Sequence, residues 1–149
     1  MRIVLDDGAY MPERAHPTDA GLDLRTPFEI TVPGSVGLSF GLTDAVHIGA
    51  SVINTGVHID IPIGYVGMIK SKSGLNVKNG LIAEGVIDAG YTGSIVVKLY
   101  NMTDMAYHFL AGDKIAQLVI MPFIAPDMEV VTELDETDRG NNGFGSTGR

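Results

Sequence analysis

Five short segments of this sequence mix glycine with polar side chains that a purely structural scaffold does not need. They are residues 20–24, 71–75, 85–93, 112–118 and 139–148. The last segment combines glycine-rich backbone, which offers many N–H groups, with the hydroxyls of Ser146 and Thr147 and the cation of Arg139. Together these groups could wrap a phosphate chain. The composition of this segment also fits a disordered tail or an expression remnant, so the sequence leaves both interpretations open.

Several common catalytic motifs are missing from the sequence. Lys72-Ser73 has the Lys-Ser pair of a Walker A phosphate loop but not the glycine that must precede it. We expect no nucleophile elbow of the α/β-hydrolase type, and the lack of cysteine excludes disulfides and thiolate zinc ligands. The four histidines, His16, His47, His58 and His108, do not have the spacing of metal ligands. We therefore expect no zinc site, and we expect His58 to be a surface residue.

Short runs of β-branched residues, separated by turn signals, must position these segments. Residues 57–61 alternate as a half-buried strand does, and residues 95–100 and 115–120 resemble buried strands. Weaker strand candidates are residues 3–5, 29–32, 46–53, 65–69, 81–87, 107–110 and 128–132. Many short strands at close spacing predict an all-β sandwich, barrel or jelly roll. One short helix is expected near residues 73–78, capped by Ser73 or flanked by Gly80.

Length and charge restrict the class of protein further. A chain of 149 residues fits one domain, and 19 glycines with 7 prolines argue against long helices. The net charge of −8 argues against sequence-independent binding to DNA or RNA. A small anionic substrate can still bind where positively charged residues are clustered. We find no signal peptide or membrane-spanning run and expect a cytoplasmic protein. Residues 133–149 are too polar to pack a core, which predicts a body over 1–132 and an arm over 133–149.

In this order, the five segments closely resemble the five motifs of the homotrimeric dUTPase family, from about Ala20 to the C-terminus. The resemblance implies a β jelly-roll subunit and a trimer whose active sites each draw motifs from more than one subunit. It implies that the arm closes over a neighbouring subunit's site. The implied reaction is hydrolysis of dUTP to dUMP and pyrophosphate, which removes dUTP and supplies a dTTP precursor. Mg²⁺ would be held by the triphosphate, with at most a water-mediated contact to Asp23 or Gln117.

The resemblance also implies roles for individual residues. Asp88 would orient and deprotonate the attacking water, and the ring of Tyr91 would lie under the deoxyribose and exclude a 2′-hydroxyl. Ser73 would donate to a phosphate oxygen as pyrophosphate leaves, although on the sequence alone it could equally be a helix N-cap. Phe144 would stack on the uracil ring.

The expected phosphate contacts come from the second, fourth and fifth segments. Lys72 stands where the family usually has arginine, and a lysine cannot make a bidentate phosphate grip. Arg139 would act like an arginine finger. Asp113 would orient a basic neighbour, and Asp23 would organise the site or simply cap a loop. The remaining expected site residues are Gly74, Lys114, Gln117, Gly145, Ser146 and Thr147.

The resemblance implies that backbone groups of residues 82–86 read the uracil edge. The residues expected to do so are Ile82, Ala83, Gly85 and Val86, with Glu84 pointing into solvent. The stretch 34–56 is longer than in many relatives, and we interpret it as an elaborated hairpin.

Two alternative functions remain open at this point. A dCTP deaminase of the same fold family would need a carboxylate where this chain has Lys98. A regulatory binding module is the other alternative, because some phage-encoded members of the family bind other proteins. If this chain is phage-encoded, a protein partner is expected, and the stretch 34–56 is the feature that motivates it.

Overall fold

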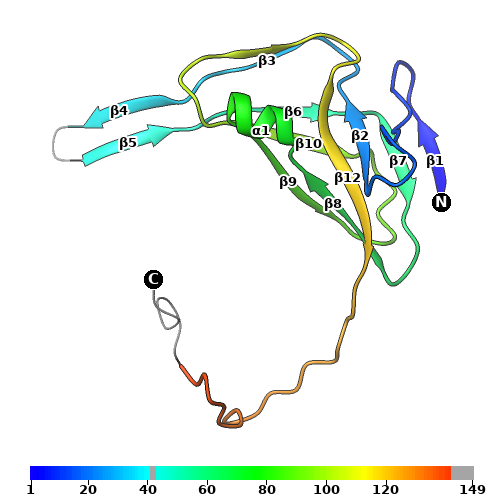
Figure 1. Ribbon diagram of the computed structural model, residues 1–149, viewed down its shortest axis with the longest axis vertical. Coiled ribbons are helices and arrows are strands. Elements are labelled where there is room, and N and C mark those ends of the chain that lie inside the picture. Colours follow the sequence, from blue (N-terminus) through cyan, green and yellow to red (C-terminus); the bar gives the residue numbers. More distant parts are fainter. Residues whose placement is uncertain (41–42, 142–149) are drawn as a thin grey trace.

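The computed structural model describes residues 1–40 and 43–141 and consists of short strands with one short helix (Figure 1). The elements in chain order are β1 (Arg2–Leu5), β2 (Gly21–Arg25), β3 (Ile30–Val32), β4 (Val36–Phe40), β5 (Thr43–His47), β6 (Gly49–Asn54), β7 (Val57–Asp60), β8 (Tyr65–Lys70), α1 (Ser73–Asn79), β9 (Leu81–Ile87), β10 (Val96–Asn101), β11 (Tyr107–Phe109) and β12 (Lys114–Pro122). This arrangement confirms the predicted all-β, jelly-roll-like fold with a short helix.

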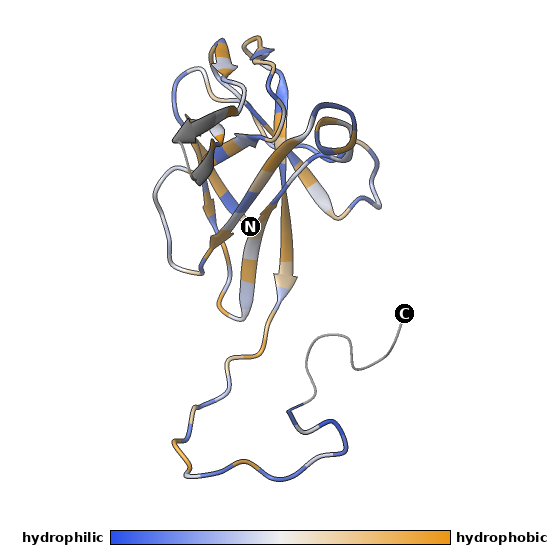
Figure 2. Cartoon of the chain, turned by 90° about the vertical axis from the view of Figure 1, so that its left-hand side faces the viewer, coloured by the Kyte–Doolittle hydropathy of each residue, from blue (hydrophilic) through white to orange (hydrophobic). Residues whose placement is uncertain are grey.

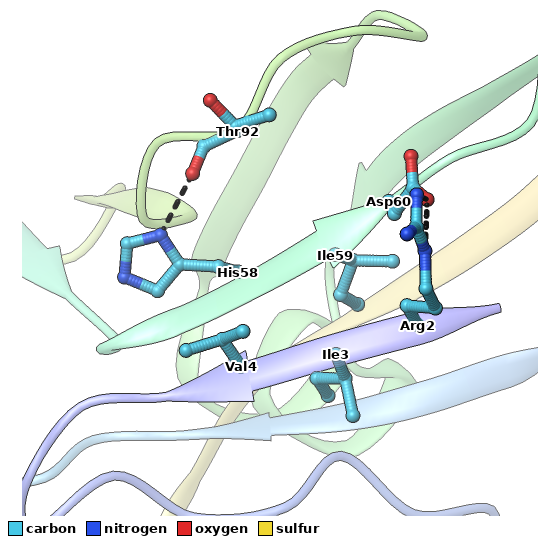
Figure 3. Close-up of a pocket in the computed structure, with 7 residues that line it drawn as sticks. All are labelled: Arg2, Ile3, Val4, His58, Ile59, Asp60 and Thr92. Atoms are coloured by element: carbon cyan, nitrogen blue, oxygen red, sulfur yellow. Dashed lines mark hydrogen bonds and ion pairs between the residues drawn. The ribbon is translucent and has the colours of Figure 1, made fainter.

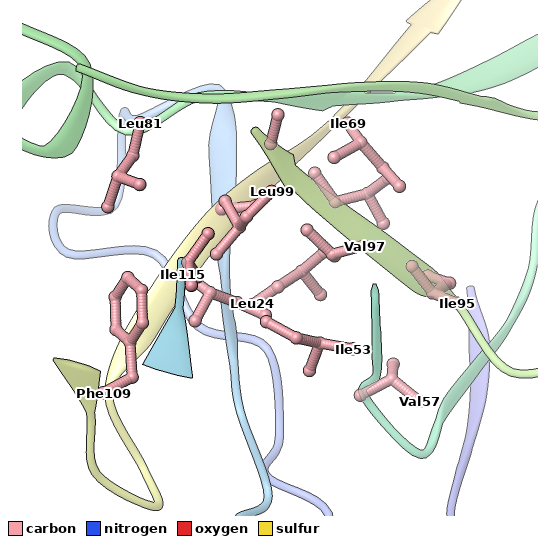
Figure 4. Close-up of a cluster of buried hydrophobic side chains, with 14 of the residues drawn as sticks. Leu24, Ile53, Val57, Ile69, Leu81, Ile95, Val97, Leu99, Phe109 and Ile115 are labelled. Carbon is pink, nitrogen blue, oxygen red and sulfur yellow. The ribbon is translucent and has the colours of Figure 1, made fainter. Parts of the chain in front are cut away.

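A curled, antiparallel six-stranded sheet forms most of the body, in the order β2-β12-β8-β9-β10-β6. The pairs β1-β7, β11-β3 and β4-β5 complete the described strands. Because side chains alternate along each strand, one face of the sheet supplies the core and the other is free for polar residues. The core residues are Leu24, Val32, Ile53, Val57, Ile59, Ile61, Ile69, Leu81, Ala83, Ile95, Val97, Leu99, Phe109, Ile115, Ala116 and Leu118 (Figure 4).

Two of the expected strands are wrong. Residues 46–53 form parts of two strands, because β5 pairs with β4 whereas β6 pairs with β10, and the chain changes partner at Ile48. Residues 128–132 are exposed and contain no strand, since no other strand of the described chain lies beside them to accept their hydrogen bonds. Strands β2 and β4 were not among the expected elements. The alternation of β2 was hidden by its glycine and charged residues.

Helix α1 confirms the short helix that was expected near residues 73–78. Its N-cap is Lys72, which has extended backbone, so Ser73 is the first helical residue and the predicted capping role for Ser73 is wrong. Gly80 ends the helix in the left-handed conformation with φ of 62°, and its N–H donates to the Asn76 carbonyl at 3.0 Å.

The stretch 34–56 contains the β4–β5 hairpin, where a hairpin was predicted, and this hairpin projects from the body (Figure 1). At the other end of the chain, β12 ends at Pro122, and residues 123–141 run away from the body in exposed, extended form (Figures 1 and 2). The predicted boundary between residues 132 and 133 stays a prediction. In the described part of the chain, no helix has the length and apolar character needed to cross a membrane.

Candidate active site

Asp23 is the centre of a charged cluster that joins three of the motif segments. It is the one buried charged residue in the described part of the chain, with 5% of its surface exposed. Its Oδ2 lies 2.6 Å from the Lys114 Nζ, and its Oδ1 accepts a hydrogen bond from the Lys72 Nζ. Segments far apart in the sequence therefore meet on one carboxylate. The organising role expected of Asp23 stays a prediction.

A β-bulge in β12 explains how Lys114 reaches Asp23. Lys114 pairs with Arg25 and Ala116 with Leu24, so Ile115 is an extra residue in the ladder. Ile115 and Ala116 are both fully buried, although neighbouring strand residues normally point to opposite faces. The bulge therefore turns Lys114 to the polar face of the sheet.

The cluster carries a surplus of positive charge. Lys72 and Lys114 bring two positive charges to the single carboxylate of Asp23. Arg25 is the second residue after Asp23 on β2, and its Nη1 donates to the Gly112 carbonyl at 2.6 Å. A chain with a net charge of −8 presents here a local site suited to an anion.

The two lysines also determine the ionisation of Asp23. Burial of the carboxylate raises its pKa, but the hydrogen bonds and charges of Lys114 and Lys72 outweigh burial, and the pKa of Asp23 lies below its ordinary value. Asp23 is therefore an anion at neutral pH. Because this pKa is lowered on folding, the resulting stability is present above about pH 4 and is lost as the pH falls through the pKa of the folded protein.

We expect Asp23→Asn to lower the free energy of unfolding at pH 7 by about 1–3 kcal/mol. This is less than for a fully buried pair, because both ammonium groups keep some contact with solvent. Thermal unfolding from pH 7 to pH 3 measures the effect. The gap between wild type and Asp23→Asn should narrow below about pH 4. A gap that stays constant over this range would contradict the assigned ion pairs.

Gln117 lies beside Asp23 in the β-ladder and connects the cluster to the second motif segment. Its Nε2 donates to the Ser71 carbonyl at 3.0 Å. The Gln117 amide oxygen lies so close to Gly21 that a Cβ at that position would overlap it. Ser71 Oγ in turn accepts from the Ala83 N–H at 2.9 Å and donates to the Ala83 carbonyl at 3.2 Å.

Gly21 and Ser71 lie within the motif segments, but the sequence indicated no role for either of them. It also indicated no role for Arg25. Ser71 ties the second segment to β9, and Gly21 makes room for Gln117. The alternation Gly21, Asp23, Arg25 along one face of a strand was a signal that could have indicated Arg25.

Asp88 and Tyr91 lie in a tight turn at the opposite end of β9. The Tyr91 N–H donates to the Asp88 carbonyl at 3.2 Å, and Gly90 has φ of 88°, which favours glycine. The Tyr91 hydroxyl donates to the Ser94 carbonyl at 2.9 Å, and its ring covers Gly93, where a Cβ would overlap the hydroxyl. Asp88 and Tyr91 are both exposed. The turn therefore presents a carboxylate and an aromatic ring outward.

Within one chain, the turn with Asp88 and Tyr91 lies away from the charged cluster around Asp23. Asp88 follows the end of the β8–β9 ladder, where Ile87 pairs with Gly67, whereas the cluster lies level with Lys70, which pairs with Gln117 beside Asp23. Gly67 and Lys70 are three residues apart, so at least roughly 10 Å of strand separates the turn from the cluster. The two groups are too far apart to act on one phosphate.

The edge of β9 that faces β10 is open next to the turn. The two strands pair only at Leu81, Ile82 and Ala83. Beyond Ala83, residues 84–87 pair with β8 on one side and have no strand on the other among the described residues. Successive residues of a strand direct their N–H and carbonyl groups to opposite edges. Those of Ala83 and Gly85 face β8, where Ala83 is bonded to Ser71, so Glu84 and Val86 present their backbone groups on the unpaired edge.

The other predicted site residues have simpler surroundings. Asp113 accepts from the Leu110 N–H at 2.8 Å and closes a turn, so its carboxylate is not the one that holds the lysines. Glu84 is exposed as expected and pairs with Lys70 at 2.7 Å. Ser73 and Gly74 are exposed in the first turn of α1. Arg139 is exposed in the tail, and Phe144, Gly145, Ser146 and Thr147 lie outside the described residues.

Comparison with known proteins gives consistent matches. The family model described as dUTPase matches residues 7–148. A deoxyuridine 5′-triphosphate nucleotidohydrolase of Rhodococcus erythropolis is 40% identical, covering 97% of this chain and 82% of the relative. The enzyme of the same name from Paramecium bursaria Chlorella virus 1 is 37% identical, covering 97% and 94%.

Solved structures agree with these sequence matches. The dUTPase of Staphylococcus bacteriophage 80alpha with dUPNHPP superposes with a TM-score of 0.83 at 30% identity, covering 99% of this chain and 98% of that one. A dUTPase variant from phage phi11 of S. aureus, described as coordinating a structural Mg(II) ion, has a TM-score of 0.74 at 29% identity, covering 91% and 98%. Since the family model spans nearly the whole chain and the named relatives are matched over most of their length, the chain belongs to the dUTPase family.

Proposed function

We propose that the chain is a dUTP diphosphatase that hydrolyses dUTP to dUMP and pyrophosphate, with Asp88 holding the water that attacks the α-phosphate. The main support for this proposal is that a chain of the dUTPase family carries two separate features that suit the substrate. A cationic cluster is built from three motif segments around Asp23, and a separate turn exposes Asp88 and Tyr91. The first feature suits a triphosphate, and the second suits a sugar and a water.

In the proposed phosphate site, Lys72 and Lys114 meet the phosphate oxygens as point charges, while Asp23 keeps their side chains aligned. Ser73 donates its hydroxyl to a phosphate oxygen. A Cβ at Gly74 would meet nothing within this chain, so packing inside the chain does not require glycine there. A close approach by phosphate gives a reason for it, because glycine in a helix costs about 1 kcal/mol relative to alanine.

In the proposed nucleoside site, the open edge of β9 pairs with the uracil ring. Backbone N–H and carbonyl groups of Val86 would copy a base-pairing edge, with Gly85 and Ile82 beside them. Because Ser71 already occupies the Ala83 backbone groups, we assign Ala83 a smaller part than the sequence suggested. Tyr91 would lie under the deoxyribose. Asp88 would accept the proton of the attacking water, a role typically worth about 10²–10⁴-fold in rate.

We propose that Mg²⁺ arrives with the triphosphate and lowers the negative charge that the phosphates present to water. No group of three or more metal-ligating side chains occurs among the residues that the structure describes. Both Asp23 oxygens already bond to lysines, so Asp23 does not fit as a direct ligand. Gln117 has an amide oxygen next to this cluster, and a water-mediated contact of the metal to Asp23 or Gln117 stays a prediction.

We propose a trimer in which each active site takes the charged cluster from one subunit and the Asp88 turn from another. The separation of the turn and the cluster along β8 within one chain, at least roughly 10 Å, supports this arrangement. The arm would complete the site. Arg139, Ser146 and Thr147 would meet the outer phosphates, and Phe144 and Gly145 would cover the base. The exposed course of residues 123–141 away from their own body is compatible with reaching another subunit.

Pyrophosphate release from dUTP, dCTP, dTTP and UTP, with Mg²⁺ and again with chelator, tests the reaction. We expect release from dUTP only, and only with Mg²⁺. Release from dUTP without Mg²⁺ would contradict the metal assignment, and release from UTP would contradict the Tyr91 gate. A folded protein that releases nothing from any of the four nucleotides would contradict the proposed function.

Three expectations stay predictions. The place of action is expected to be the cytoplasm. A regulatory partner is expected if the chain is phage-encoded, with the β4–β5 hairpin as the motivating feature. The alternative of dCTP deamination remains disfavoured, because Lys98 lies 4.8 Å from the centre of the Tyr100 ring and supplies a cation where that reaction would need a carboxylate.

A further inference from the structure

The turn that carries Asp88 and Tyr91 has few attachments to the rest of the protein. Its internal hydrogen bonds join Tyr91 to Asp88 and to Ser94. In the part of the chain that the structure describes, one hydrogen bond ties residues 88–93 to another element. It joins the Thr92 carbonyl to the Nδ1 of His58 on β7, at 2.8 Å (Figure 3). This histidine therefore links the middle of the turn to β7, while Ser94 after the turn bonds to Asn54 on β6.

His58 is bonded on both sides of its ring. Its Nε2 lies 3.1 Å from Oδ1 of Asp6, and its side chain is only 27% exposed. Asp6 is itself fixed, because its N–H donates to the Gly56 carbonyl at 2.8 Å. The ring thus bridges the turn at Thr92 to an anchored carboxylate at the end of β1.

Both ring nitrogens face hydrogen-bond acceptors, and this geometry selects one form of the imidazole. The imidazolium donates to Thr92 and Asp6 at the same time. A neutral ring has a single N–H and must turn a lone pair toward either the carbonyl or the carboxylate. Because the charged carboxylate is the stronger acceptor, the neutral ring keeps its N–H on Nε2 toward Asp6 and loses the hydrogen bond to Thr92.

We propose that the His58 imidazolium is a positioning residue that holds the Asp88–Tyr91 turn in place. Its deprotonation then weakens dUTP binding and relaxes the discrimination against UTP. This inference rests on the proposed roles of Asp88 and Tyr91. It concerns a histidine outside the five motif segments that the sequence indicated only as a surface residue.

The charged surroundings of His58 favour the imidazolium. The Thr92 carbonyl and the Asp6 carboxylate raise the pKa of His58 above its ordinary value. Arg2 and Asp60 line the same groove, but they pair with each other at 2.8 Å, so their charges largely cancel. The bridge is therefore complete below about pH 6.5 and is lost as the pH rises through the pKa of the folded protein.

The test uses kcat and KM for dUTP and UTP between pH 5.5 and 9 in three variants and the wild type. His58→Asn keeps an amide donor near the position of Nδ1, and His58→Gln keeps one near Nε2 only. His108→Asn is the matched control, because His108 is also bonded on both sides, to Thr31 at 3.0 Å and to Glu29 at 3.1 Å, and lies on β11.

For the wild type, we expect kcat/KM for dUTP to fall about tenfold as His58 loses its proton, mainly through KM, with a lower dUTP-to-UTP ratio. His58→Gln should behave at every pH as the wild type does at high pH. His58→Asn should lose the pH dependence, and His108→Asn should keep it. If His58→Gln has the same pH profile and the same dUTP-to-UTP selectivity as the wild type, the proposal is overturned.

A second measurement does not depend on activity. In NMR spectra, the amide signals of Gly90 and Gly93 should follow the titration of His58 in the wild type but not in His58→Asn. If they do not follow it, the bridge is overturned even where dUTP is hydrolysed. If they do follow it but dUTP is not hydrolysed, the proposed function fails while the bridge between ring and turn stands.

Discussion

Asp88→Asn should abolish dUTP turnover and leave nucleotide binding nearly unchanged. The side chain is exposed on a tight turn and makes no side-chain hydrogen bond within the described part of the chain, so the substitution removes no internal contact. An amide can still orient a water but cannot take its proton, and the loss of a general base typically costs about 10²–10⁴-fold.

The test compares single-turnover rates with the Kd for dUTP in the wild type and in Asp88→Asn. The thermal unfolding temperature is the control and should not change. Turnover within about threefold of the wild type would remove Asp88 from the chemistry. A large loss of binding together with an unchanged rate at saturation would instead make it a ligand-positioning group.

Truncation after Asp138 should have an effect of similar size. It removes Arg139 and the glycine-rich segment, which are proposed to meet the outer phosphates and the base. Arginine fingers contribute about 10³–10⁵ in rate in other phosphate-transferring enzymes, and we expect the lower end because a metal shares the charge. The body should stay folded, because its last strand ends at Pro122 and residues 123–138 are exposed.

Arg139→Ala in the full-length chain separates the cation from the rest of the arm. The truncated protein should lose more activity than this single variant, since it also loses Phe144 and the covering backbone. Circular dichroism and the oligomeric state serve as controls for both. A truncated enzyme with full activity would contradict the role assigned to the arm.

The sequence predicted the fold class because several strands show a clear period of two. Residues 57–60 of the predicted 57–61 alternate as expected and form β7, and residues 81–87 form β9 at the predicted bounds. The strand predicted over 46–53 failed because an apolar run does not reveal where a strand changes partner. The run 128–132 failed because β-propensity is expressed only where a neighbouring strand is available.

The site could be predicted to the level of residue type but not of contact. Motif resemblance indicated Asp23, Lys72 and Lys114, but their meeting on one carboxylate depends on the bulge at Ile115. A bulge arises from the pairing of two strands and leaves no clear mark in either. The bridge at His58 was invisible for a similar reason, since its partner is a backbone carbonyl 34 residues away.

The central claim is that each active site takes its cationic cluster and its Asp88 turn from different subunits. Mixing two inactive variants tests it most directly. Asp88→Asn and Lys72→Ala chains are co-expressed with different tags, and mixed trimers are isolated and assayed with dUTP. Each mixed trimer should contain one intact site, so an unfractionated random mixture should regain about a quarter of wild-type activity. A mixture no more active than its two components would contradict the claim, because it would mean that both groups must come from the same chain.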